Sequence, residues 1–378
     1  MLGIAFAVVC ALPQPTHAGV TVPAAQTING CVVQSGAVCP ESNFTGQVFV
    51  GENLHSVDFK GSDFSTSRFT SVIFHNASLA NSVMVLTEHK GTDFREAGLQ
   101  DANFSSATLA DLMLNGTNVN GARFASAMLT NVRSVSATLV KADFTDSSVF
   151  MSTFSRVDLT GARFGRAQIV GSRFTASTLP QASFRQARIT GESSFAGAVM
   201  DGVELTEAVI ENTDFVNAIM PAAVLSGAQL TTSDFSGANL NDAFFIGTQA
   251  RASSFAGAAL TGADFTSADF STPNPDQQLR NDFSSAVLVN ANFTDTNLTG
   301  AWFGGANLQG ANFTGATLVG AAFPGADLRG VDLPVEAFDT RGRPRFTCDR
   351  NTKRSGALRA KLRPFCKGVR NVIYLQAK

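Results

Sequence analysis

Large apolar residues recur at every fifth position along most of the chain, most clearly over residues 306–330, which read ANLQG ANFTG ATLVG AAFPG ADLRG. In each five-residue unit a large residue occupies the central position, alanine lies two positions before it, and glycine closes the unit. The central residues of this stretch are Leu308, Phe313, Leu318, Phe323 and Leu328. We expect these five side chains, and their counterparts elsewhere, to define the core.

A period of five fits neither regular secondary structure, because five steps turn a helix through about 140° and bring a strand to its opposite face. The central residue and the small residue before it can both face inward if the chain turns a corner after every unit. Phenylalanine and leucine also alternate, as at Phe94, Leu99, Phe104 and Leu109. An even number of sides is therefore expected, and four is the smallest that encloses a core.

This motif resembles that of the pentapeptide-repeat family. The resemblance extends roughly from Phe44 to Phe338 and implies an all-β fold, a right-handed quadrilateral β-helix with four units per coil. The units fall into three continuous stretches, at 44–189, 195–270 and 283–338. They correspond to about fourteen coils, stacked about 4.8 Å apart. Such a solenoid has two open ends that need caps.

The repeat divides the chain into four segments. Residues 1–18 hold an apolar run and resemble a secretory signal peptide. Residues 19–43 are expected to form an N-terminal cap, 44–338 the β-helix, and 339–378 a basic C-terminal cap or tail. We therefore predict export to the periplasm or the cell exterior. No further stretch approaches eighteen apolar residues, so no transmembrane helix is predicted.

The cysteines support the prediction of export. Cys31 and Cys39 precede the first coil, and Cys348 and Cys366 follow the last. Of the three possible connectivities, local pairing within each end segment is the simplest. Each disulfide would then hold one cap together in an oxidising compartment.

Two interruptions break the repeat. One extra residue between Gly191 and Ser194 is interpreted as a bulge at a corner. The segment 271–282, STPNPDQQLRND, adds some eight residues and predicts a projecting loop. A loop on an otherwise smooth rod is a candidate site for recognition, although a tolerated insertion is the alternative. The candidate interaction residues of this loop are Pro273, Asn274, Pro275, Asp276, Gln277, Gln278 and Arg280.

Charge is distributed unevenly. Residues 340–378 carry twelve Lys or Arg and a single acid, for a net charge of +11, which leaves −13 for the rest. Arginines gather at 156–188 and acids at 192–214. Either these charges solvate one another on neighbouring faces, as exposed pairs that contribute little stability, or they form a docking surface. Trp302, the only tryptophan, directly precedes a central position and should point outward, where the tail or a partner would cover it.

A few residues depart from the pattern. His89, Ser134 and Ala250 occupy central positions, and Glu52 occupies a place where alanine is preferred. His55 and His75 are twenty positions apart and should stack about 5 Å apart on one face. Two imidazoles at that spacing suggest a metal site, but such a site normally needs three or four ligands, so solvated histidines are favoured.

The sequence offers no firm signature of an enzyme. It contains no glycine-rich phosphate loop, HExxH motif or nucleophile elbow, and its acids are spread along the repeat. We therefore predict a non-enzymatic protein with no catalytic residue, no metal and no cofactor. The predicted function is that of a structural or binding scaffold. Its faces and its loop would be presented to a macromolecular partner, either a protein or a surface polymer.

Two other functions are left open. Some members of the resembled family mimic duplex DNA and bind type II topoisomerases. The net charge of −13 before residue 340 fits such a DNA mimic, whereas the arginine cluster at 156–188 does not. Alternatively, the basic tail anchors the rod to an anionic surface. Nucleic acid is disfavoured as a partner, and the resemblance leaves a homodimer open.

Overall fold

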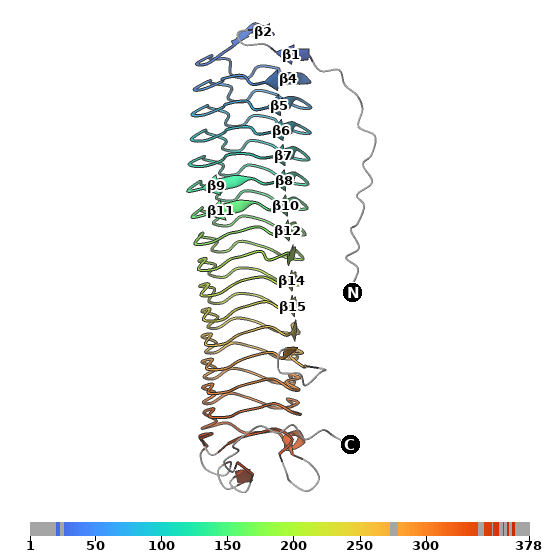
Figure 1. Ribbon diagram of the computed structural model, residues 1–378, viewed down its shortest axis with the longest axis vertical. Helices are drawn as coiled ribbons and strands as arrows, with labels where there is room; N and C mark the ends of the chain where they lie inside the picture. The colour runs from blue at the N-terminus through green and yellow to red at the C-terminus, as the bar shows by residue number, and fades with distance from the viewer. Residues whose placement is uncertain are drawn as a thin grey trace, which may run out of the picture.

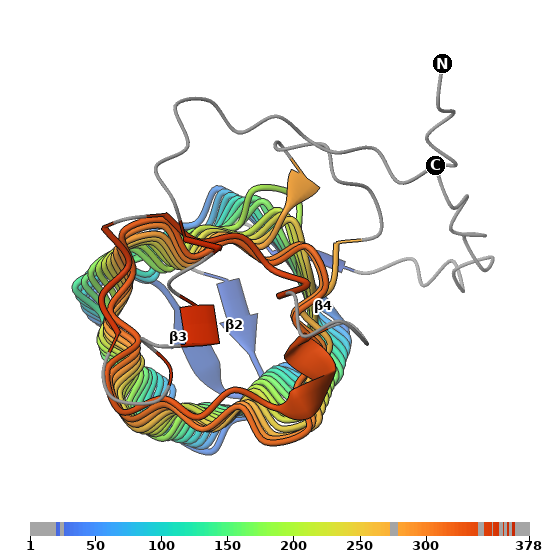
Figure 2. The same ribbon diagram turned by 90° about the horizontal axis from the view of Figure 1, so that it is seen from below.

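The computed structural model describes residues 20–22, 26–272, 279–338 and, in the C-terminal segment, 344–349, 351–354, 358, 361–362 and 365–366. Residues 1–19, 273–278 and most of 355–378 lie outside this description, and with them the predicted signal peptide, most of the loop and most of the basic tail. The described chain forms one long rod of stacked coils (Figure 1). Seen along its axis, the coils superpose in a four-sided outline (Figure 2).

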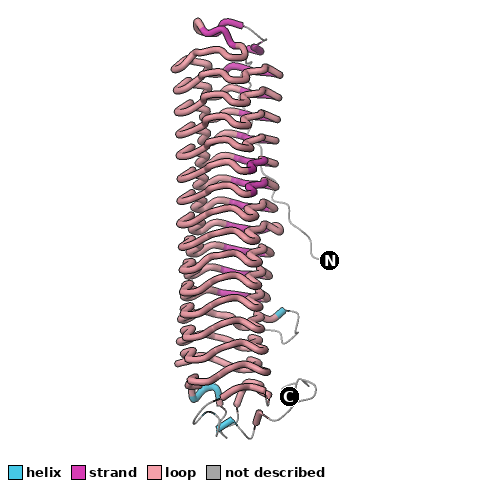
Figure 3. Tube along the Cα trace, turned by 90° about the vertical axis from the view of Figure 1, so that its left-hand side faces the viewer, coloured by secondary structure: helices cyan, strands magenta, loops and turns pink. Residues whose placement is uncertain are grey.

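Short strands form at the same place in successive coils, and most join one parallel sheet. The twelve-stranded sheet has the order β1-β4-β5-β6-β7-β8-β10-β12-β13-β14-β15-β16. Figure 3 shows these strands in a column along one side of the rod. The bounds are β1 Val20–Val22, β2 Gln26–Ile28, β3 Cys31–Val33, β4 Gln47–Val50, β5 Arg68–Thr70, β6 Glu88–Lys90, β7 Thr108–Ala110, β8 Met128–Thr130, β9 Arg133–Val135, β10 Ser148–Phe150, β11 Thr153–Ser155, β12 Gln168–Val170, β13 Arg188–Thr190, β14 Val209–Glu211, β15 Gln229–Thr231 and β16 Gln249–Arg251.

The pairing register gives the number of residues in a coil. Arg68 pairs with Glu88, a separation of twenty residues, which is four five-residue units. Across the first interruption Arg188 pairs with Val209, a separation of twenty-one. Across the second, Ser254 pairs with Asp282, a separation of twenty-eight. The repeat therefore continues on both sides of each interruption, with one extra residue at the first and eight at the second.

The core is a solid column of central side chains. Leu308, Phe313, Leu318, Phe323 and Leu328 are all buried, with at most 1% of their surface exposed. Phenylalanines of successive coils stack nearly parallel, as between the rings of Phe144 and Phe164, whose centroids are 4.6 Å apart at an interplanar angle of 2°. Burial of such side chains contributes roughly 1.5 to 3 kcal/mol each, so the core stabilises the coils without a ligand.

The residue two positions before each central residue is small because it also faces inward. At several of the positions where serine or threonine replaces alanine, the hydroxyl donates to the carbonyl of a central residue in the preceding coil. Ser177 donates to the Phe154 carbonyl at 2.8 Å, and Thr117 to the Phe94 carbonyl at 2.7 Å. These buried hydroxyls are therefore satisfied, as buried polar groups usually are.

Each unit closes at a corner where the backbone adopts a positive φ. Gly310 has φ of +70°, and a Cβ there would lie 2.4 Å from the Asn290 side chain of the coil above. Asparagine itself forms such a corner at Asn290, with φ of +57°. Glycine and asparagine are among the residues that adopt this conformation most readily, which explains their frequency in the last position of the unit.

Both ends of the described rod are capped. At the N-terminal end β1 pairs in parallel with β4, and β2 and β3 form an antiparallel hairpin that lies across the first coil (Figure 2). Val33 and Cys31 are buried there, and Cys31 forms a disulfide with Cys39.

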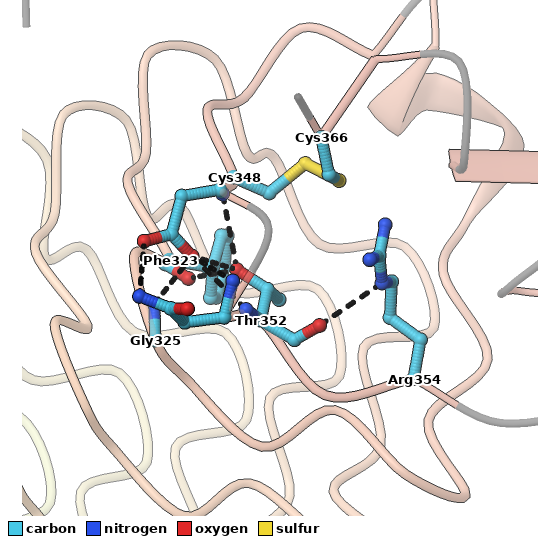
Figure 4. Close-up of a disulfide and its surroundings, with 8 residues drawn as sticks. Phe323, Gly325, Cys348, Thr352, Arg354 and Cys366 are labelled. Carbon is cyan, nitrogen blue, oxygen red and sulfur yellow. Dashed lines mark hydrogen bonds between the residues drawn. A yellow bond between two sulfur atoms is a disulfide. The ribbon is translucent and has the colours of Figure 1, made fainter. Parts of the chain in front are cut away.

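At the C-terminal end a 3-10 turn, η2 (Val335–Ala337), is followed by residues that extend the ladder. Thr347 and Lys353 bridge to Ala322 and Asp327 of the last complete coil, and Thr352 donates to the Phe323 carbonyl at 2.8 Å. Cys348 forms a disulfide with Cys366 beside these contacts (Figure 4).

The single acid of the basic segment, Asp349, fixes this cap. Its Oδ1 accepts hydrogen bonds from the backbone N–H groups of Gly325 and Thr352, each at 2.9 Å (Figure 4). Burial by itself would raise the pKa of Asp349, but these hydrogen bonds favour the carboxylate and lower its pKa. Asp349 thereby satisfies the corner N–H of Gly325, which in other units is satisfied by a backbone carbonyl.

Candidate interaction surfaces

The side chains on either side of each central residue point outward, so every face of the rod carries two columns of exposed residues. We number the faces in chain order. Face 1 lies outside Phe44 and Phe64, face 2 carries the twelve-stranded sheet, face 3 carries β9 and β11, and face 4 lies outside Leu79 and Leu99. Face 3 is therefore opposite face 1.

Several charged side chains on faces 1 and 2 pair within the chain. Arg188 on face 2 lies 2.9 Å from Glu211, and Arg163 on face 1 lies 3.1 Å from Asp143. At the adjoining corner Arg166 lies 2.6 Å from Asp146, and the hydrogen bond it donates lowers the pKa of that carboxyl. The arginine cluster at 156–188 therefore consists largely of side chains neutralised by acids of adjacent coils. This pairing favours the interpretation in which the charges solvate one another over a docking surface at this cluster. Such exposed pairs contribute little stability.

Face 3 differs, because its charges lie in separate blocks. Arg133, Arg156 and Arg173 are exposed and form no ion pair with any described residue. Below them Asp214 and Asp234 occupy adjacent rungs of one column, also without an ion pair to the described chain. Their carboxylates accept only local hydrogen bonds, from Ser194 and Val216 to Asp214 and from Ser236 to Asp234.

Two open grooves lie along this charged part of face 3. The first, of about 470 Å³, is lined by Asn131, Arg133, Thr153, Ser155 and Arg156 around β9 and β11. The second, of about 600 Å³, is lined by residues that include Arg173, Glu192, Asn212, Asp214 and Asp234. The first groove is basic, and the second combines one arginine with three acids.

The second groove begins at the bulge predicted near Gly191. Gly191 and Glu192 both have positive φ, +68° and +62°, so the corner is one residue longer than elsewhere. The chain then returns to register because Ser193 fills the small inward position and donates to the Thr190 carbonyl at 2.7 Å. A Cβ on Gly191 would lie 2.7 Å from Val170, so glycine is required there.

Exposed apolar side chains lie on faces 4 and 1, which meet at a corner. Val199 and Ile219 bridge on face 4, and Val224 and Phe244 bridge on face 1, one corner further along the chain. Ile219, Phe244 and Ile246 are 45%, 42% and 40% exposed. These five residues define what we call the apolar corner patch. Exposed apolar surface of this kind often marks a site of interaction with another protein.

The two surface histidines lie one above the other at the predicted spacing, with their rings tilted by 56°. The rings of His55 and His75 have centroids 5.2 Å apart, and Nε2 of His75 lies 3.4 Å from Glu96. Within the described residues no group of three or more His, Cys, Asp or Glu side chains is placed to hold a metal ion. The pair therefore lacks a third ligand in this part of the chain.

Two titratable side chains, His89 and Glu52, point into the core. His89 stacks on Phe69 at 4.5 Å, and burial lowers its pKa to about 3. Its Nε2 has no hydrogen-bond partner among the described residues. Glu52 takes a small inward position, and burial raises its pKa, although backbone hydrogen bonds partly oppose this. Both residues are isolated in the core and form no site with another titratable group of the described chain.

The loop at 271–282 can be followed only at its two ends, since Pro273, Asn274, Pro275, Asp276, Gln277 and Gln278 lie outside the described residues. Arg280 is described, and its guanidinium lies over the Trp302 ring at 3.9 Å from the ring centroid. The expectation that the tail or a partner covers Trp302 therefore needs correction, because the returning arm of the loop covers it. The charged fork stacks on the indole through a cation–π contact. No sequence pattern indicated this contact.

The comparisons with known proteins agree with this geometry. The family model described as pentapeptide repeats matches eight copies, at residues 49–84, 152–191, 198–237, 222–248, 233–271, 282–315 and 297–333. These matches span more than half of the chain. The chain therefore belongs to the pentapeptide-repeat family, and the predicted all-β, right-handed quadrilateral β-helix is confirmed.

Solved structures with a similar fold include other pentapeptide-repeat proteins. HetL, involved in heterocyst differentiation regulation in the cyanobacterium Nostoc sp. strain PCC 7120, is 19% identical, and the match covers 75% of this chain and 88% of HetL with a TM-score of 0.23. Full-length QnrB1, a plasmid-mediated fluoroquinolone resistance protein, is 20% identical over 52% of this chain and 94% of QnrB1, with a TM-score of 0.22. At these identities the likeness concerns the fold alone. No curated protein matches the chain. In the described part of the chain, no helix is long and apolar enough to cross a membrane.

Proposed function

We propose that this protein is a non-enzymatic, exported scaffold that binds another protein through its apolar corner patch. The observation that carries the proposal is the exposure of Val199, Ile219, Phe244 and Ile246, between 37% and 45%, on neighbouring rungs of two adjoining faces. Large apolar side chains left in water on adjacent rungs are stabilised when a partner covers them. Stacked phenylalanines fill the interior of the rod, so a partner would bind at its outer faces.

Export is supported by the disulfides in the two caps. Cys31–Cys39 and Cys348–Cys366 each join residues that cover one end of the core. Disulfides persist in oxidising compartments and are rare in the cytosol. The leader-like segment 1–18 agrees with this compartment. Fractionation of the native cell, with the thiol state of each fraction measured by alkylation, tests this part of the proposal, and a protein found only in the cytosol with free thiols would contradict it.

The partner is tested by capture from the exported fraction. Wild-type protein and the double variant Phe244→Asp/Ile246→Asp are immobilised side by side. The matched control is Met128→Asp/Phe150→Asp, which changes an apolar pair on β8 and β10 of face 2. We expect the wild type and the control to retain the same protein and the patch variant to lose it. Equal recovery by all three would exclude the patch.

The alternative of a DNA-mimicking rod is less well supported. A DNA mimic presents a continuous acidic surface, whereas the upper part of face 3 carries Arg133, Arg156 and Arg173 without neutralising acids in the described chain. A gyrase supercoiling assay tests this alternative directly. Attachment through the basic tail concerns residues that largely lie outside the description, and it is tested by deleting 367–378 and measuring salt-dependent adsorption to anionic surfaces.

A further inference from the structure

We propose that two copies of the chain associate side by side and antiparallel through face 3, with the two-fold axis at the bulge between Arg173 and Ser194. This inference does not depend on the proposed partner, which would bind at the corner of faces 4 and 1. The surface involved comprises the outward columns of face 3 from Asn53 to Ala322.

The first argument is the separation of unpaired charges on this face. On faces 1 and 2 an arginine and an acid occupy neighbouring rungs and pair, as in Arg68–Glu88 at 3.1 Å. On face 3 like charges are neighbours, since Asp214 pairs in register with Asp234 one rung below. Like charges directly opposite each other in a sheet are unfavourable. No described residue forms an ion pair with either block, but a second copy in the opposite orientation brings the basic block onto the acidic one.

The second argument is that the face is divided evenly by the bulge. The ladder on face 3 contains seven rungs above the bulge and seven below, not counting Thr347 of the cap. These rungs are Asn53, Ile73, Asp93, Met113, Arg133, Thr153 and Arg173 above, and Ser194, Asp214, Asp234, Ser254, Asp282, Trp302 and Ala322 below.

Rotation about the two-fold axis places each upper rung against a lower rung of the other copy. Arg133 then faces Asp234, and Arg173 faces Ser194 with Asp214 and Glu192 within reach of its long side chain. Near the ends Ile73, which is 38% exposed, faces the stack of Arg280 on Trp302. A two-fold interface uses the same patch on both copies, so each of these contacts occurs twice.

One pair of acids also becomes opposed, Asp93 and Asp282. Asp93 carries its own counter-ion, because Arg95 donates to its Oδ2 at 2.6 Å. Burial would raise the pKa of Asp93, but the hydrogen bonds and charge of Arg95 lower it, so the pair Asp93–Arg95 is neutral as a unit. The guanidinium of Arg95 is half exposed and can approach Asp282 of the second copy.

The shape of the face permits close approach. Beside the charged column, the second outward column around the bulge contains only small or medium uncharged residues: Val135, Ser155, Thr175, Ala196, Val216 and Ser236. These side chains are all half-buried against the coil. Arg133 and Asp234 can therefore meet across a flat seam without a bulky side chain between the two rods.

The area of the seam sets its expected strength. Fourteen rungs spaced about 4.8 Å apart, on a strand of three residues about 10 Å wide, give about 600 Å² per copy. This is at the low end of stable interfaces, which bury about 1,200 to 2,000 Å² in total. We therefore expect a reversible dimer at micromolar concentration. Because its specificity comes from exposed charges, high salt should dissociate it.

Sedimentation velocity of the full chain tests the proposal, at about 1 to 100 µM protein in low salt and again in 1 M NaCl. One variant reverses the basic block, Arg133→Glu/Arg173→Glu. A second reverses the acidic block, Asp214→Arg/Asp234→Arg. The matched control is Arg123→Glu/Arg251→Glu, which makes the same change in net charge on faces 1 and 2. Circular dichroism and thermal melting establish that each variant is folded.

We expect the wild type and the control to dimerise in low salt and to dissociate in 1 M NaCl. Each block variant alone should be a monomer, because its two halves then carry charge of one sign. An equimolar mixture of the two block variants should recover a dimer, since an all-acidic face 3 then meets an all-basic one. A wild type that stays monomeric at 100 µM would overturn the proposal. So would block variants that still dimerise, which would place the contact elsewhere, or a mixture that remains monomeric.

Discussion

At the scale of single residues, His89 is an unfavourable member of the core. It occupies a central position, is 2% exposed, stacks on Phe69 at 4.5 Å and leaves Nε2 without a partner in the described chain. A buried donor or acceptor without a partner costs about 1 to 3 kcal/mol. Phenylalanine occupies the equivalent position two coils above, at Phe49, so the column accepts a benzene ring there.

We predict that His89→Phe raises the free energy of unfolding at neutral pH by about 1 to 3 kcal/mol. It should also flatten the dependence of stability on pH. Burial lowers the pKa of His89 to about 3, below its ordinary value of 6.5. The unfolded chain therefore binds a proton more readily, so the stability contributed by neutral His89 is complete above pH 6.5. As the pH falls from 6.5 towards 3, this stability is lost by up to about 1.4 kcal/mol per pH unit.

The measurement is the melting temperature of wild type and His89→Phe between pH 4 and 8. The control His55→Gln removes an imidazole from the surface. The difference between His89→Phe and the wild type should widen below pH 6.5. A constant difference across the range would show that His89 is not held neutral by burial.

Trp302 offers a second test at this scale, because it is the only tryptophan of the chain. Its ring lies beneath Arg280 and above Gly304, where an added Cβ would come within 3.0 Å of three ring atoms. We predict that Arg280→Ala shifts the emission of Trp302 to the red and increases its quenching by acrylamide. The loss of stability should be small, about 0.5 to 1 kcal/mol for an exposed cation–π contact.

Gly304→Ala should produce the same spectral change by displacing the ring from the other side. Arg251→Ala, a substitution on face 2, is the control and should leave the emission unchanged. If Arg280→Ala leaves the emission maximum and the quenching unchanged, the loop arm does not cover Trp302 in solution.

Much of the residue-scale description could be predicted from the fivefold period. The central positions, the outward direction of Trp302 and the spacing of His55 and His75 all follow from a coil of twenty residues. The contact of Arg280 with Trp302 does not, because Arg280 lies outside the repeat and its position depends on the path of the loop. The unpaired state of Arg133 and Arg173 also needed the structure, since their neighbours in sequence include acids that pair with other arginines.

At the scale of elements, the bulge at Gly191 and Glu192 can be removed without breaking the repeat. The central positions Ile189 and Phe195 are six residues apart, against five in a regular unit. Deleting Glu192 leaves the unit Thr190-Gly191-Ser193-Ser194-Phe195, in which Gly191 forms the corner and Ser193 the small inward residue. We predict that this deletion keeps the fold with an unchanged or higher melting temperature, because it restores the regular coil.

Deletion of Gly171 is the matched control. It shortens a regular unit to four residues, so that Ser172 or Phe174 leaves its inward position and the coils below lose their register. A shift of one residue moves inward side chains to the outside. The expected loss is more than about 4 kcal/mol, beyond the usual effect of a single change. Equal loss from both deletions, measured by chemical denaturation, would mean that the bulge is itself required for folding.

The two interruptions also differ in how much the sequence could say about them. The length of each was predictable, because the ladder resumes in register, with Arg173 paired to Ser194 and Ser254 to Asp282. The groove beside the bulge was not, because it depends on how Arg173, Glu192 and Asp214 of three different coils converge. The meeting of side chains from different coils depends on the geometry of the corner, which the sequence of a single five-residue unit does not specify.

At the scale of the whole molecule, the two proposed surfaces lie on different sides of the rod. Face 3 is opposite face 1, and the apolar corner patch lies between faces 4 and 1. A dimer joined through face 3 would therefore leave Phe244 and Ile246 of both copies exposed to a partner. The block-reversal variants and the patch variant change separate faces, so loss of dimerisation and loss of partner binding can be measured independently.

The caps determine how such a rod unfolds. Each coil contacts only its neighbours, so the stability of a solenoid is close to a sum of local terms and opening begins at the ends. The disulfides Cys31–Cys39 and Cys348–Cys366 close short segments, with sequence separations of 8 and 18 residues, at those two ends. Closing loops of this length stabilises a chain by roughly 2 to 3 kcal/mol in the chain-entropy account.

We predict that Cys31→Ser/Cys39→Ser accelerates amide hydrogen exchange in β3, β4 and the coil of Phe44, with little change around Phe144 and Phe164. Cys348→Ser/Cys366→Ser should act in the same way on the coils of Phe313 and Phe323, and each variant serves as the control for the other. The reason is that a coil in the middle of the stack keeps both of its neighbours when an end opens. Exchange that increases uniformly along the rod in either variant would mean that the stack opens as a single cooperative unit, and that the caps act on all of its coils at once.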